Sequence, residues 1–401
     1  MKNYTNWIIE NIDYVCKIFG KRLAGSENVK KANDYVVSLL SDWVDEIKRE
    51  KFSMHPTAWS KSILLQCQCG LLSIICLWIS HFFPSLIFNA AILILLIIWA
   101  LTWVCEYILY MRLTDFCYKK KEGENIFAAR KAGEETRQRV IICAHIDAAY
   151  EMPFFLYMKA WMIYLLIALA DGGLIFFLIS SVLNIFGLIS ELATIELCIA
   201  MIFTACSLIL FLFFINWKMV SPGANDNLTG CFVALSLLKE LSENNERMKY
   251  TDVCCLITDG EEAGLRGSFA YVESHKQDLL ETNSIVIAAD TFNDKKELMV
   301  YHRGIFFTQK NSLQVCELLR LGAKQCGIDL PYTDFYPGAT DAEAFSRNGI
   351  RAAAICGNTH KPSRTYHTRY DIPESLNADA IEAARNILKE SIRIFDNMEG
   401  V

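Results

Sequence analysis

The sequence lacks several features that would place it in a common protein class. It has no basic excess: 401 residues carry a formal net charge of −6, which gives no electrostatic footprint for nucleic acid. Its 15 cysteines show no regular spacing, which argues against a paired Cys-x-x-Cys zinc motif and a small secreted disulfide framework. The first residues contain no apolar run, so we expect no cleaved signal peptide. We also find no internal repeat and no low-complexity linker.

Charge itself is missing from one long stretch. Between Ser62 and Cys105 there is no Asp, Glu, Lys or Arg. Because about 20 apolar residues are enough to cross a bilayer, this stretch predicts two membrane spans, at 63–83 and 86–107, joined at Phe83-Pro84-Ser85. Two further uncharged runs, 172–190 and 197–217, predict a second hairpin and hence four transmembrane helices in total.

The start of the second hairpin is less well defined. Its first span could begin near Ala160, which would place Asp171 inside the membrane. An ionisable residue within a span is a candidate functional residue. We favour the alternative that Asp171 marks a kink or a boundary.

The remaining sequence is typical of a soluble α/β protein. Residues 139–144 form a strand-like run of the buried type. Further along, helix-like runs at 229–242, 308–326 and 378–396 alternate with strand-like runs at 253–257, 284–289, 298–301 and 352–355. This alternation predicts an α/β sheet with helices on both faces. Ser26 could cap an amphipathic helix that runs through Trp43. We therefore predict one soluble domain in three pieces, 1–60, 112–158 and 218–401, which is interrupted by membrane hairpins at 61–111 and 159–217.

Acids and histidines follow several buried strands or lie beside glycines. These residues are His145, Asp147, Asp226, Glu261, Glu262, Asp290 and His367. Loops beyond the strands of an α/β sheet are where such folds bind ligands, and buried unpaired carboxylates are costly. Acids from several separate elements therefore need a shared cation. Histidines and carboxylates without cysteine suit zinc or a similar divalent ion in an open, catalytic site, and paired ions would activate a water for hydrolysis.

The order of these motifs resembles metallopeptidase family 28, the co-catalytic zinc aminopeptidases and their glutamate-carboxypeptidase relatives. His-x-Asp at 145–147 is followed by Gly-Ala-x-Asp-Asn-x-x-Gly at 223–230, Glu-Glu-x-Gly-x-x-Gly-Ser at 261–268, a strand-end Asp290 and Tyr-His-Thr at 366–368. Arg22-Leu23-Ala24-Gly25-Ser26 resembles the family's N-terminal signature, and 338–345 resembles its late Ser/Thr-Asp-x-x-x-Phe element. The resemblance implies the zinc exopeptidase fold, with a mixed, largely parallel sheet flanked by helices.

The resemblance also implies two zinc ions and a ligand set. His145 and Asp290 would hold one ion, Glu262 and His367 would hold the other, and Asp226 would bridge both. His360 lies near His367 in the sequence and stays open as an alternative ligand.

Two further residues receive catalytic roles from the resemblance. Glu261 would be the general base that takes a proton from the metal-bound water and passes it to the leaving amine. Asp147 would orient His145. The family often has a cis peptide bond after the bridging aspartate, which is here the bond between Asp226 and Asn227. Tyr332 and Tyr336 could line the substrate pocket or simply pack.

The predicted function is that of a membrane-anchored di-zinc exopeptidase that acts on peptides, with an aminopeptidase favoured. A carboxypeptidase or amidase of the same family is one alternative, and a non-catalytic binding module on a peptidase fold is another. The complete ligand set argues against the binding module.

The family's aminopeptidases are mostly secreted or single-pass, so the inserted hairpins depart from its pattern. The second hairpin lies between Asp147 and Asp226, which predicts an active site close to the bilayer, where substrates are free peptides or segments emerging from the membrane.

The charges beside the spans predict an orientation. Four spans return the chain to its starting side, so all soluble pieces share one face of the membrane. Basic residues flank the spans on that face: Lys48, Arg49, Lys51, Lys61, Arg112, Lys119-Lys120-Lys121, Lys159 and Lys218. The opposite turns hold His81, Glu191 and Glu196. Lys and Arg mark the cytoplasmic side of a membrane, and unpaired cysteines suit a reducing compartment. We therefore predict a multi-pass cell-membrane protein with a cytoplasmic catalytic domain. The cytosolic face of an internal membrane fits equally well. The sequence indicates no oligomeric state.

Overall fold

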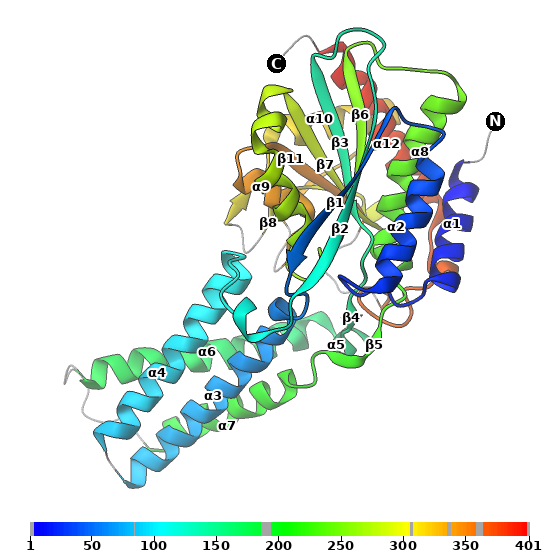
Figure 1. The fold of residues 1–401 in the computed structure, drawn as a ribbon. Helices are drawn as coiled ribbons and strands as arrows, with labels where there is room; N and C mark the ends of the chain where they lie inside the picture. Colours follow the sequence, from blue (N-terminus) through cyan, green and yellow to red (C-terminus); the bar gives the residue numbers. More distant parts are fainter. Residues whose placement is uncertain are drawn as a thin grey trace. The chain divides into compact units, whose positions relative to one another are not determined.

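The computed structural model describes residues 4–83, 85–185, 194–304, 308–334, 338–357 and 364–398. The chain forms two compact units (Figure 1). The sheet unit consists of Met1–Pro56, Lys120–Glu151 and Lys218–Val401, and the helical unit consists of Thr57–Lys119 and Met152–Trp217. Each unit is therefore assembled from segments that are far apart in the sequence.

The sheet unit is built on one mixed sheet in the order β1-β2-β6-β3-β7-β11-β8-β10, with β9 beside β8. Strands β6, β3, β7 and β11 at its centre run parallel, while β2 and β8 join them antiparallel. This confirms the predicted mixed, largely parallel sheet. The strands are β1 (Glu46–Met54), β2 (Lys121–Arg130), β3 (Gln138–His145), β6 (Thr251–Thr258), β7 (Ser284–Phe292), β8 (Met299–Gly304), β9 (Gln309–Lys310), β10 (Tyr332–Asp334) and β11 (Arg351–Gly357).

Helices cover both faces of this sheet, as predicted. Because neighbouring side chains of a strand point to opposite faces, Val140 and Ile142 of β3 enter one core, while Ile141 and Cys143 enter the other. The first core is closed by α1 (Tyr4–Ile18), α2 (Glu27–Leu40), α8 (Thr229–Glu243), α10 (Leu313–Gln325) and α12 (Ala378–Asn397). The second is closed by α9 (Arg266–Glu281) and α11 (Asp341–Arg347).

The sequence predicted some ends of helices correctly and others not. Ser26 caps α2 as expected, since its hydroxyl accepts a hydrogen bond from the Val29 N–H. That helix ends at Leu40, before the expected end at Trp43. The run at 308–326 contains the short strand β9 first, and its helix begins only at Leu313.

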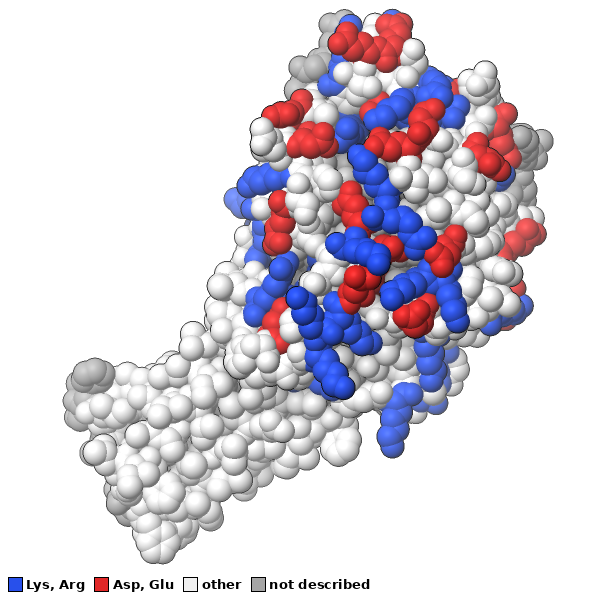
Figure 2. Space-filling view, in the orientation of Figure 1, with Lys and Arg blue, Asp and Glu red and all other residues white. Residues whose placement is uncertain are grey.

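The helical unit contains α3 (Ala58–Phe82), α4 (Leu86–Thr102) with its continuation η1 (Trp103–Ile108), α5 (Pro153–Tyr157), α6 (Ala160–Ile185) and α7 (Thr194–Phe211). Three helices are long and apolar enough to cross a membrane: Ala58–Phe82, Leu86–Ile108 and Ala160–Ile185. A shorter apolar helix covers Leu197–Phe211. The predicted fourth span therefore stays a prediction. In Figure 2, charged residues gather on the sheet unit, whereas the visible, described surface of the helical unit is predominantly uncharged.

Asp171 requires a correction. Helix α6 begins at Ala160 and continues through Asp171 to Ile185, so Asp171 is not a boundary of the helix, while the alternative that it marks a kink stays a prediction. The apolar residues on both sides of this single acid extend the helix through it. Pro84, in the predicted turn of the first hairpin, lies outside the described residues.

Candidate active site

The predicted site residues lie where neighbouring strands end. His145 is the last residue of β3, and Asp290 lies near the end of β7. Glu261 and Glu262 lie in the loop that follows β6, just after Asp259 and Gly260. Since the carboxyl ends of adjacent parallel strands meet at one edge of a sheet, the order β6-β3-β7 places these side chains together.

Two irregular segments supply the other two residues. Asp226 lies in the turn η3 (Ala224–Leu228), immediately before α8. The peptide bond between Asp226 and Asn227 is cis, as expected. His367 lies in the loop between β11 and α12 and has a positive φ of 50°.

The two carboxylate oxygens of Asp226 face different histidines. Its Oδ1 lies 3.2 Å from Nε2 of His145, and its Oδ2 lies 3.0 Å from Nε2 of His367. Glu262 joins the second histidine, with Oε1 at 3.2 Å from Nε2 of His367. Asp290 joins the first, with Oδ1 at 4.0 Å from Nε2 of His145. Asp226 thus lies between two overlapping groups of ligand atoms.

Glu261 lies beside the first of these groups. Its Oε2 is 3.8 Å from Nε2 of His145. One atom each of His145, Glu261 and Asp290 lies within 4.8 Å of the others, and the same holds for His145, Asp226 and Glu262. Imidazole nitrogens and carboxylate oxygens at this density form a donor set that fits zinc.

The electrostatics of the cluster also favour a cation. Burial raises the pKa of Asp290 to about 7, and burial raises the pKa of Glu261 well above its usual value, although His145 opposes that rise. Burial alone would lower the pKa of His367, but Glu262 and Asp226 outweigh it and raise this pKa to about 10. Among the residues that the structure describes, four mostly buried carboxylates therefore share two imidazoles, and the cluster needs either protons or a bound cation.

Asp147 holds two parts of the site at once. Its main-chain oxygen lies 3.1 Å from Nδ1 of His145, nearer than its own carboxylate Oδ1 at 3.6 Å. That contact leaves Nε2 of His145 directed at the cluster. The carboxylate of Asp147 instead accepts the N–H groups of Glu261 and Glu262, each at 3.2 Å. Asp147 therefore contacts both glutamates as well as the histidine that it was predicted to orient.

Two residues that position the site received no role from the sequence. The carboxylate of Asp371 accepts the N–H groups of Asn225 at 2.7 Å and Asp226 at 3.1 Å, which fixes the turn that carries the bridging aspartate. The fully buried Arg22 donates to the main-chain oxygens of Ile146 and Gly223, each at 2.9 Å. The only local signals were the position of Asp371 four residues after His367 and the N-terminal signature that contains Arg22.

The open alternatives at the site are only partly described. His360 and Tyr336 lie outside the described residues. The Tyr332 hydroxyl donates to Glu317 of α10, and its ring lies 4.7 Å below the Arg320 guanidinium. These contacts favour a packing role for Tyr332.

Comparison with known proteins points to one family. Residues 213–392 match the sequence model of peptidase family M28. This range contains Asp226, Glu261, Glu262, Asp290 and His367. A search of curated proteins found no match.

Several solved structures share the fold. A glutaminyl cyclase from an Acidobacteriales bacterium is 12% identical, covers 99% of this chain and 96% of its own, and has a TM-score of 0.57. BSAP, a zinc aminopeptidase from Bacillus subtilis, is 14% identical over 98% and 95%, with a TM-score of 0.56. A leucine aminopeptidase precursor from Bacteroides thetaiotaomicron is 12% identical over 99% and 97%, also with a TM-score of 0.56. At these identities the likeness extends to the fold alone.

Proposed function

The chain belongs to peptidase family M28, and from this premise we propose that it is a membrane-anchored aminopeptidase with two zinc ions. The number of ions is proposed from the carboxylate of Asp226. One of its oxygens faces His145 and the other faces His367. One carboxylate shared between two histidines fits a bridged pair of ions.

The remaining donors divide in the same way. His145 and Asp290 would hold one ion, and Glu262 and His367 would hold the other, with Asp226 between them. When bound, the ions would supply Lewis-acid activation of the scissile carbonyl and of the attacking water.

Glu261 is the residue to which we assign proton transfer. Its carboxylate lies beside His145 and Asp290, while its main-chain N–H is held by Asp147. From this position it would accept a proton from the attacking water and return it to the leaving amine. The four strand-end and turn carboxylates thus have separate roles: three bind and one transfers a proton.

The end of the peptide that is cleaved distinguishes an aminopeptidase from a carboxypeptidase of the same family. An aminopeptidase needs a free α-amine near the ions, so an N-acetylated peptide should resist cleavage. The experiment compares a free peptide, its N-acetylated counterpart and a peptide that begins with glutamine, with mass analysis of the products. The Glu261→Gln protein, purified in parallel, controls for contaminating peptidases.

We expect stepwise release of the N-terminal residue from free peptides only. Release of residues from the carboxyl end of the acetylated peptide would make the protein a carboxypeptidase instead. Loss of ammonia from the glutamine peptide without shortening would assign it the reaction named for the solved glutaminyl cyclases.

We further propose that the helical unit anchors the enzyme in a membrane as a multi-pass unit with a cytoplasmic catalytic part. Three described helices have the required length and composition. The basic residues next to the spans support this orientation, because Lys and Arg gather on the cytoplasmic side.

A further inference from the structure

A two-pronged ion pair joins the His367 loop to the chain segment that enters the second hairpin. Glu151 is the last residue of the sheet unit before this hairpin, and its side chain is fully buried. Arg369 lies two residues after His367. Its Nε is 2.6 Å from Oε1 of Glu151, and its Nη2 is 2.7 Å from Oε2. The main-chain N–H of Arg369 also donates to Oε1 at 3.3 Å.

The chain that leaves the hairpin contacts the same loop. The Ser221 hydroxyl donates to the main-chain oxygen of Thr368 at 3.0 Å, and the Ser221 N–H donates to Ala149 at 2.9 Å. Strands β4 (Tyr150–Glu151) and β5 (Asn216–Val220), which flank the hairpin, pair with each other. The two residues that follow His367 are therefore bonded to both flanks of the hairpin.

His367 needs such external support. It lies outside helices and strands, and its φ of 50° is in a region that non-glycine residues seldom occupy. Its Nε2 must nevertheless stay within reach of both Asp226 and Glu262. A planar guanidinium that binds a carboxylate with two prongs fixes orientation as well as distance.

We propose that Glu151 and Arg369 are positioning residues that hold His367 in place and thereby set the affinity of the zinc position that His367 shares with Glu262. This inference rests on the proposed function, because it presupposes two zinc ions. It makes that one metal position depend on the segment from which the membrane hairpin emerges. The other position, at His145 and Asp290, does not use this pair.

The test measures zinc binding to the full-length protein in detergent, by elemental analysis and by titration against a competing chelator. Arg369→Met removes the guanidinium. Because removal of one member of a buried ion pair is strongly destabilising, the double variant Glu151→Gln, Arg369→Met removes the charge as well. Arg369→Lys keeps the charge but loses the two-pronged contact.

We expect one zinc ion to bind as in the parent and the other to bind at least tenfold more weakly, since partners of metal ligands typically contribute about 10- to 100-fold in affinity. Arg369→Lys should fall between the parent and Arg369→Met. Such a split between two ions is not the result of a general loss of stability, which would weaken both.

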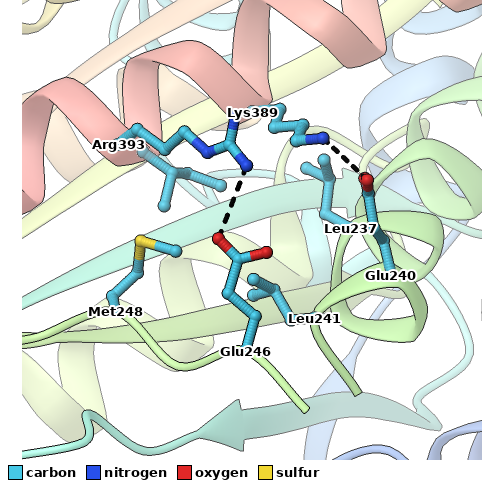
Figure 3. A pocket seen from close by; sticks show the side chains of 8 residues that line it. Leu237, Glu240, Leu241, Glu246, Met248, Lys389 and Arg393 are labelled. Carbon is cyan, nitrogen blue, oxygen red and sulfur yellow. Dashed lines mark hydrogen bonds and ion pairs between the residues drawn. The ribbon is translucent and has the colours of Figure 1, made fainter. Parts of the chain in front are cut away.

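A matched control comes from a different, partly buried ion pair. Glu240 of α8 is 12% exposed and pairs with Lys389 of α12 at 2.7 Å, and Arg393 of α12 pairs with Glu246, which lies after the end of α8 (Figure 3). Glu240 lies eleven residues after Thr229, roughly 16 Å along the helix axis. Glu240→Gln should leave both zinc affinities unchanged.

Three results would overturn the inference. Parental affinity for both ions in the double variant would show that the pair does not position His367, while leaving the proposed function intact. Equal weakening of both ions would also overturn it, because the pair would then be only structural. A folded parent protein that binds no zinc would overturn the proposed function, and this inference with it.

Discussion

Asp226 and Glu261 are two carboxylates of the same cluster to which we assign different tasks. Asp226 faces both histidines, whereas Glu261 lies beside only one of them. A ligand that serves two ions cannot be removed without loss of metal, but a proton carrier can be replaced by an amide of the same shape. The two residues should therefore respond differently to substitution.

Glu261→Gln should keep its zinc and lose peptide turnover by at least about 100-fold, the usual contribution of a positioned acid or base. Asp226→Ala should lose zinc as well as turnover. Metal content and initial rates, measured on the same preparations, check both statements. Parental activity in Glu261→Gln would contradict its assignment as the base.

A site residue can be recognised in the sequence when it stands in a short motif, but not when its role depends on hydrogen bonds with distant segments. His145, Asp226 and the two glutamates stand in short motifs next to strands, and such motifs can be recognised one at a time. Asp371 and Arg22 act through hydrogen bonds with main-chain groups of distant segments. No local pattern encodes those partners, so their roles become visible only in the folded chain.

At the scale of elements, burial decided which strands could be predicted. Strands β3, β6, β7 and β11 are buried on both faces and carry unbroken apolar runs. Strand β1 is an edge strand with the sequence EIKREKFSM, in which four consecutive residues are charged and Met54 is the one fully buried residue. Its pairing with β2 includes the ion pair between Arg49 and Glu124. Such a strand has no apolar run, and neither β1 nor β2 was predicted.

The residue before β1 gives a prediction about pH. Asp45 accepts hydrogen bonds from Arg247 and from the Lys131 N–H. Mainly through Arg247, the pKa of Asp45 is lowered to about 2. A lowered folded-state pKa stabilises the protein above the unfolded-state pKa near 4, and this contribution is lost as the pH falls from about 4 to 2. Since both side chains are about one-third exposed, we expect about 1 kcal/mol or less.

Asp45→Asn should therefore lower the melting temperature at pH 6, and the gap to the parent should narrow as the pH falls below 4. Arg247→Met should show the same trend, and the double variant should lose little more than either single one. Thermal unfolding from pH 3 to pH 6 tests this. A gap that stays constant over this range would mean that the ion pair does not stabilise the fold.

For the whole molecule, the sequence predicted the division between apolar and charged segments better than the limits of the spans. The long uncharged runs marked α3 and α4, because composition alone identifies such helices. The start of α6 was placed too late, since one acid does not end a helix whose neighbouring residues are apolar. Glu191, in the predicted outer turn, lies outside the described residues.

The proposed orientation in the membrane leads to a prediction about protease access. With the catalytic part in the cytoplasm, protease added to intact cells should leave the sheet unit whole, and permeabilised cells should lose it. Sealed vesicles of known sidedness allow the same comparison for an internal membrane. Cleavage of the sheet unit from outside intact cells would contradict the orientation, and with it the inference that the substrates are cytosolic peptides.

The central claim is that the sheet unit is a two-zinc enzyme, and the metal content of the purified full-length protein tests it most directly. Elemental analysis after removal of loosely bound ions should find two zinc ions per folded chain. Asp226→Ala, purified in the same way, should retain neither at parental affinity. A folded parent chain that holds no metal would contradict the account and would favour a non-catalytic binding module on the peptidase fold.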